Sequence, residues 1–148
     1  MHPTVFRWLL NLYPPYWGTG IRVVRVSPDY RAVDVEMPLR FYNRNYVGTH
    51  FGGSLSAMVD PFYMLMLLQI LGRDYIVWDR SSHIEFLRPG RGRVRAEFRI
   101  TDSFLSEIRR QTENGDKFLP ELTVEITGPD GEAVARVTKT LYIRRKQR

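Results

Sequence analysis

A long apolar segment from Leu55 to Leu71 constrains the fold of this chain more than any other feature of its sequence. After Pro61, with Gln69 as the exception, its side chains are apolar on every face of the helix that they would form. Such a helix has no polar face to turn to water, so other elements must cover most of it. Gly72 follows as a natural helix stop. The run is shorter than the roughly 20 apolar residues that cross a bilayer, and it therefore predicts a buried core helix.

Residue runs typical of β-strands lie on both sides of this helix in the sequence. They alternate apolar with polar side chains or are rich in β-branched and aromatic residues, and turn signals such as Asp130-Gly131 separate them. The six expected strands are Ile21–Ser27, Tyr30–Met37, Tyr75–Leu87, Arg93–Thr101, Leu119–Thr127 and Ala133–Ile143. Two shorter helices are expected at Pro3–Tyr13, ended by Pro14-Pro15, and at Ser103–Asn114, with Ser103 as N-cap.

This order of elements predicts an α+β fold in which a curved antiparallel sheet of about six strands wraps around a long central helix, with a short N-terminal helix added. The 148 residues suit one domain over 1–148, with residues 1–15 as the N-terminal helix and 144–148 as a basic tail. Cysteine is absent, which excludes disulfides and thiolate metal sites. No secretory signal is recognisable, and we expect a soluble, cytoplasmic protein.

The chain is basic, with a formal net charge of +6 and a pI near 9.9. A basic surface attracts phosphates, either of nucleic acid or of a substrate that carries coenzyme A. The alternative interpretation is that the excess charge belongs to a solvated, arginine-rich face with no binding role. The arginines are interspersed with acidic residues, and no nucleic-acid recognition motif is present. We therefore expect neither nucleic acid nor a membrane as a partner. No metal ligand set and no nucleotide-binding motif is recognisable either.

The polar, glycine-rich segment Asn43–Ser54 leads directly into the apolar helix, and Asp60 lies inside that helix. Ionised side chains are rarely buried without a partner or a task. One interpretation makes Asp60 a general base with a pKa raised by burial. The alternative makes it the N-cap of a helix that begins at Pro61, because Asp before Pro is a common helix start. The residues alone leave both interpretations open.

An asparagine, Gly48, His50 and a Gly-Gly pair, followed by an Asp in the next helix, resemble the hotdog thioesterases of the phenylacetyl-CoA type (PaaI-like). The chain is more similar still to a related uncharacterised hotdog family (DUF4442-like), over nearly its whole length. That closer resemblance is carried by 43–55, Pro14-Pro15, Gly18–Ile21, Asp60–Tyr63, Val77–Asp79, Phe86–Gly90 and Lys117–Glu121. It implies a hotdog fold and an acyl-CoA thioester hydrolase, with a non-catalytic acyl-ligand binder on the same fold as the alternative.

The resemblance also implies roles for single residues. Asp60 becomes the general base or nucleophile, and the backbone N–H of Gly53 polarises the thioester carbonyl. Asn45 and His50 orient water or that carbonyl. The family pattern implies no cofactor other than the coenzyme A that forms part of the substrate.

Further residues are candidates for binding the substrate. Gly52 adjoins the proposed carbonyl site, and Ser56 lies one turn before Asp60. Arg88 and Arg91 are candidates for contacts with coenzyme A phosphates, since arginine pairs well with phosphate. The alternative is that they lie on a solvated turn and bind no substrate.

Two departures from the thioesterase pattern bear on the site. Phe51 stands between His50 and Gly52, which leaves the role of His50 open. Pro61 follows Asp60 and cannot continue a regular helix, so we expect a kink or break there that frees a carbonyl and exposes Asp60.

The spacing of Gly53 and Asp60 predicts how the chain assembles. Seven residues of helix span about 10 Å, whereas a thioester carbon and its attacking water lie within about 3 Å. One helix cannot easily supply both groups to one thioester, but two antiparallel copies can. We therefore expect a homodimer, or a dimer of dimers, with the site at the interface.

Overall fold

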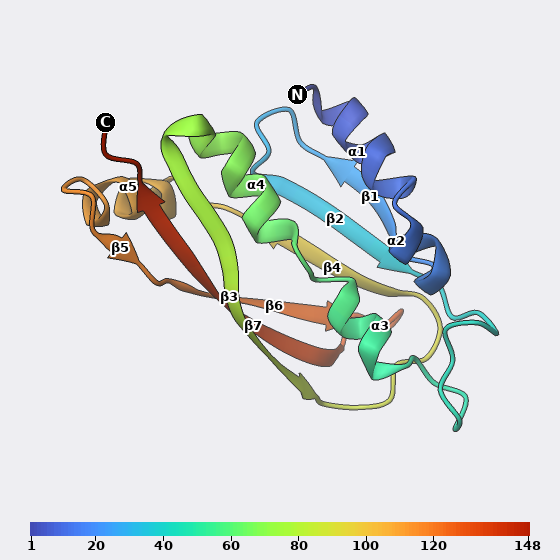
Figure 1. Ribbon diagram of the computed structural model, residues 1–148. Coiled ribbons are helices and arrows are strands. Elements are labelled where there is room, and N and C mark those ends of the chain that lie inside the picture. The colour runs from blue at the N-terminus through green and yellow to red at the C-terminus, as the bar shows by residue number, and fades with distance from the viewer.

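The protein folds around the apolar segment that dominates its sequence. The computed structural model describes residues 1–148, and in it a seven-stranded antiparallel sheet curves around helices α3 (Gly52–Ala57) and α4 (Phe62–Leu71) (Figure 1). The strands are β1 (Arg22–Val26), β2 (Ala32–Met37), β3 (Tyr75–Phe86), β4 (Val94–Arg99), β5 (Lys117–Phe118), β6 (Glu121–Thr127) and β7 (Ala133–Arg145). The remaining helices are α1 (Pro3–Asn11), α2 (Pro14–Thr19), η1 (Gly72–Asp74) and α5 (Asp102–Gln111). The predicted α+β architecture is thus confirmed.

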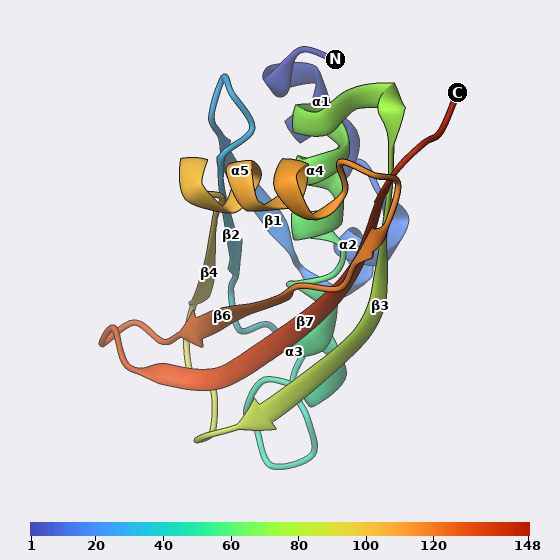
Figure 2. The ribbon, with the colours of Figure 1, turned by 90° about the vertical axis from the view of Figure 1, so that its left-hand side faces the viewer.

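The sheet has the order β1-β2-β4-β6-β7-β3, with the short β5 paired to β7. A view turned by 90° shows β2 and β4 on one side of α4, and β7 and β3 on the other (Figure 2). The curvature lets one sheet cover an all-apolar helix from two sides, which is what its sequence demands.

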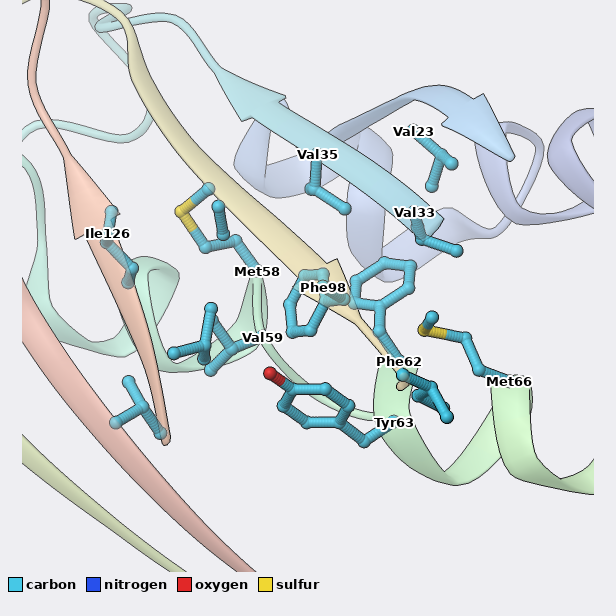
Figure 3. Close-up of a cluster of buried hydrophobic side chains, with 14 of the residues drawn as sticks. Val23, Val33, Val35, Met58, Val59, Phe62, Tyr63, Met66, Phe98 and Ile126 are labelled. Carbon is cyan, nitrogen blue, oxygen red and sulfur yellow. The ribbon is translucent and has the colours of Figure 1, made fainter. Parts of the chain in front are cut away.

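The core forms where α4 meets this curved face. Phe62, Met66 and Leu67 of α4 are fully buried. The rings of Phe62 and Tyr63 lie 5.0 and 5.1 Å from the ring of Phe98 on β4, measured between centroids (Figure 3). The segment Gly52–Asp74 is long and apolar enough to cross a membrane by length and composition. In this fold it is instead divided into separate helices, and the α4 part packs against the sheet.

The two edges of the sheet differ. At β1, the side chain of Asn11 on α1 exchanges two hydrogen bonds with the backbone of Val23, at 2.8 and 3.0 Å, so a helix covers that edge. At the other end, β3 pairs with β7 alone and has no strand on its outer side. An uncovered edge strand of 12 residues presents a row of free backbone donors and acceptors to another chain.

The predicted break at Pro61 is confirmed. Helix α3 ends at Ala57 and α4 begins at Phe62, and the peptide bond between Asp60 and Pro61 is cis. The freed carbonyl of Asp60 accepts a hydrogen bond of 2.6 Å from the hydroxyl of Tyr16 on α2. The capping alternative is wrong, because no side chain caps α4 and Pro61 itself occupies the N-cap position.

Three local predictions were wrong. Pro14-Pro15 were expected only to end the N-terminal helix, but that helix ends at Asn11 and the two prolines begin α2, because proline suits the first turn of a helix. Thr101, not Ser103, caps α5 by accepting a hydrogen bond from the N–H of Phe104. The expected tail at 144–148 begins later, because β7 continues to Arg145 through pairing with β3 and β5.

Candidate active site at the helix break

The break between α3 and α4 holds a carboxylate at the surface. The side chain of Asp60 is 62% exposed, although the residues on either side of the break are buried in the core. Beside it, an apolar hollow of about 410 Å³ opens between the α1–α2 pair and the α3–α4 segment. Its lining consists of Leu9, Leu10, Tyr13, Pro15, Tyr16, Ala57, Asp60, Pro61 and Leu65. Asp60 is the one carboxylate in that lining.

Two further charged residues lie beneath Asp60, and sequence reasoning missed both. The ammonium of Lys139 on β7 lies 3.3 Å from Asp79 on β3 and 3.8 Å from Asp60. Burial raises the pKa of Asp79, and the neighbouring Lys139 opposes that rise. Strand alternation could have identified Lys139, since it occupies an inward position between Val137 and Leu141.

The start of α3 presents the glycine pair. The first backbone N–H of α3 that donates to a preceding carbonyl is that of Ser54, which donates to Phe51. The N–H groups of Gly52 and Gly53 come before the first hydrogen bond of the helix and have no partner within it. A Cβ atom on Gly53 would lie 2.5 Å from the ring of Phe51, and one on Gly52 would lie 2.9 Å from the ring of Phe86. Glycine therefore lets two aromatic rings lie directly against this helix start.

Asn45 and His50 lie away from Asp60. The side chain of Asn45 accepts hydrogen bonds from the N–H groups of Val47 and Thr49 and donates to the Thr49 hydroxyl, so it closes its own loop. His50 is buried, with Nε2 2.7 Å from the carbonyl oxygen of Gly92. Both residues line a hollow of about 450 Å³ at the start of α3, together with Thr49, Gly52, Leu55, Phe86, Arg88, Pro89 and Gly90. Within one chain, Asn45 and His50 thus line a different hollow from Asp60.

The two candidate arginines lie beside the β6–β7 turn. Arg88 already forms ion pairs with Asp130 at 2.8 Å and Glu132 at 2.5 Å, so a phosphate would compete with two carboxylates for it. Arg91 is exposed and borders the same turn. Ser56 is half-buried on α3 and makes no side-chain hydrogen bond within the chain.

We expect the free energy of unfolding to fall as the pH drops below about 6.5, because of His50. Burial lowers the pKa of this imidazole, and its Nδ1 atom is buried without a hydrogen-bond partner. The unfolded state, with a His pKa of about 6.5, then binds the proton more readily than the folded state, so stability present above that pH is lost as the pH falls. Urea denaturation between pH 5 and 7.5 measures the effect.

The matched variant is His50→Gln, whose amide can still donate to the carbonyl of Gly92 but does not titrate in this range. Its stability should vary less with pH than that of the wild type. Identical pH profiles for the two proteins would contradict the assignment to His50.

The chain is similar to a known protein family and to several solved structures. A family model described as a domain of unknown function (DUF4442) matches residues 3–143. A Pseudomonas aeruginosa protein of unknown function, named a probable thioesterase, is 21% identical, with a TM-score of 0.84 and 99% of this chain and 97% of that chain covered. No curated protein has a sequence that matches this chain.

Two more distant structures share the fold. A thioesterase of Haemophilus influenzae is 14% identical with a TM-score of 0.70, covering 98% of this chain and 92% of that chain. A mutant of the phenylacetic acid degradation protein PaaI of Thermus thermophilus is 22% identical with a TM-score of 0.60, covering 88% of this chain and 98% of that chain. At these identities the likeness establishes the shared architecture, and the chemistry must be argued from the site.

Proposed function

The chain belongs to the DUF4442 family, as its sequence motifs predicted, and from that premise we propose that it hydrolyses acyl thioesters such as acyl-CoA. One observation carries the proposal: a solvent-exposed carboxylate, Asp60, is held in a helix break at the rim of an apolar hollow. A thioester substrate needs both features, an apolar site for its acyl group and a base beside its carbonyl carbon. Several solved proteins with this hotdog fold are named thioesterases, which supports the proposal of thioester hydrolysis.

In the proposed reaction, Asp60 removes a proton from water, and the water oxygen attacks the carbonyl carbon. The oxyanion that forms accepts a hydrogen bond from the N–H of Gly53 at the positive end of α3. The intermediate then collapses, the carbon–sulfur bond breaks, and the thiolate takes up the proton held by Asp60 or one from solvent. Direct attack by Asp60, through an anhydride that water then opens, gives the same products.

We propose that the complete site lies between two copies of the chain. The hollow that Asp60 lines does not include Gly53. The uncovered edge of β3 offers antiparallel pairing to a second β3, and a two-fold axis there would set the two α3–α4 segments side by side in opposite directions. Gly53 of one copy would then approach Asp60 of the other.

Release of free thiol, followed spectrophotometrically over a panel of acyl-CoA substrates of increasing chain length, tests the proposal. We expect saturable turnover of at least one class of substrate. Saturable binding of acyl-CoA without turnover would instead assign the protein as a binder of acyl ligands.

Leu65→Trp should discriminate against long acyl chains, because Leu65 lines the hollow beside Asp60 and a larger ring would fill it. Each methylene kept out of an apolar site loses about 0.8 kcal/mol, so excluding two of them should raise KM about tenfold. Short-chain substrates should be affected little. Leu65→Met, which conserves side-chain volume, serves as the control, and an equal loss for every chain length would place the acyl group elsewhere.

A further inference from the structure

Lys139 is a charged residue on the inner, otherwise apolar face of β7. The inward positions of β7 are otherwise apolar and buried, namely Ala135, Val137, Leu141 and Ile143. Lys139 is only 3% exposed, and an ammonium group in such surroundings is costly unless it is paired. A lysine at this position is thus held by specific partners.

Asp79 by itself satisfies the need for a partner. It lies 3.3 Å from the ammonium, its side chain is 20% exposed, and neither of its carboxylate oxygens has a hydrogen-bond donor that meets normal geometry. One buried carboxylate opposite one buried ammonium balances the charge. The second carboxylate near Lys139, that of Asp60, is therefore not required for neutralisation.

Asp60, for its part, does not need Lys139 for solvation, because most of its side chain is in contact with water. The ammonium lies 3.8 Å from Oδ1 of Asp60, which places this oxygen on the side of the carboxylate that faces the sheet. A base that takes a proton from a water on the substrate side must stay in contact with solvent, and the side chain of Asp60, 62% exposed, meets that condition. The contact thus fits orientation of Asp60 better than structural ion pairing.

We propose that Lys139, held in place by Asp79, is a positioning residue that orients Asp60. This inference rests on the proposed function, in which Asp60 is the base. Three titratable groups face Asp60 from the surrounding elements: Lys139 from β7, Asp79 from β3, and Tyr16 from α2. Burial raises the pKa of Tyr16, so its hydroxyl stays neutral, and Lys139 remains the cation that acts on Asp60.

The activity test uses Lys139→Gln, which removes the charge but keeps a side chain that can hydrogen bond to both carboxylates. We expect kcat to fall about tenfold or more with KM changed less than about threefold, because the substrate does not touch Lys139. Lys139→Arg should restore most of the activity, and Lys117→Gln, on the exposed strand β5, is the matched control.

A second readout does not depend on activity and separates this inference from the proposed function. In protein labelled with ¹³C at the aspartate carboxyl carbon, the NMR resonance of Asp60 should have a different chemical shift in Lys139→Gln than in the wild type at the same pH, because the carboxylate loses the ammonium that lies 3.8 Å from it. Reciprocally, Asp60→Asn, which alters an exposed side chain, should shift the side-chain resonances of Lys139, so the test stands even where Lys139→Gln does not fold. Unchanged resonances in these comparisons, or wild-type kcat in a folded Lys139→Gln, would make Lys139 purely structural.

Discussion

Replacing Asp60 by asparagine should lower kcat for thioester hydrolysis by about 10²- to 10⁴-fold, the range over which a positioned general base contributes. The amide has the same shape but cannot accept the proton of the attacking water. Stability should change by less than about 0.5 kcal/mol, because the side chain is largely exposed and Lys139 keeps its closer partner, Asp79. Thiol release and thermal unfolding, measured on the same preparation, separate the two effects.

Asp102→Asn provides the matched control for that experiment. Its carboxylate is 83% exposed and pairs with Arg31 on the surface, away from the helix break. It should turn over like the wild type. Turnover of Asp60→Asn within about threefold of the wild type would remove Asp60 as the base, whatever the protein is found to hydrolyse.

The sequence was sufficient for the elements whose pattern is local. Strand alternation placed six of the seven strands, and an all-apolar stretch predicted the covered helix that the sheet surrounds. The break before Phe62 followed from one physical rule, that proline cannot donate to the helical ladder. Each of these features is decided within a few residues of the chain, which is why they could be predicted.

The site was predictable only where chemistry and local structure coincide, as at Asp60. Lys139 and Asp79 were missed because their pairing joins β7 to β3, strands that are far apart in the chain. Asn45 was expected near the reacting carbonyl, but its side chain is engaged by the N–H groups of its own loop. A sequence motif names the residue types present, whereas the register of the sheet and the path of a loop decide which of them meet.

The expected dimer makes Gly53 the second decisive position. Gly53→Pro removes the proposed oxyanion donor at a place where proline is tolerated, the first turn of α3, and should cost about 10²- to 10³-fold in kcat. Gly53→Ala is the control, because it introduces the same contact with the half-exposed ring of Phe51 but keeps the N–H. A loss in the proline variant well beyond that in the alanine variant would assign the effect to the missing donor.

Mixing the two defective proteins tests whether one site draws on two chains. When Asp60→Asn and Gly53→Pro are co-expressed or refolded together in equal amounts, random pairing makes half of the dimers mixed. If Gly53 of one copy serves Asp60 of the other, each mixed dimer holds one site with both native residues and one with neither, so about a quarter of wild-type activity should return. A site built within one chain would contain a defect in every copy, and the mixture would stay as inactive as its components. Recovery of activity therefore distinguishes a shared site from a self-contained one without requiring a structure of the dimer.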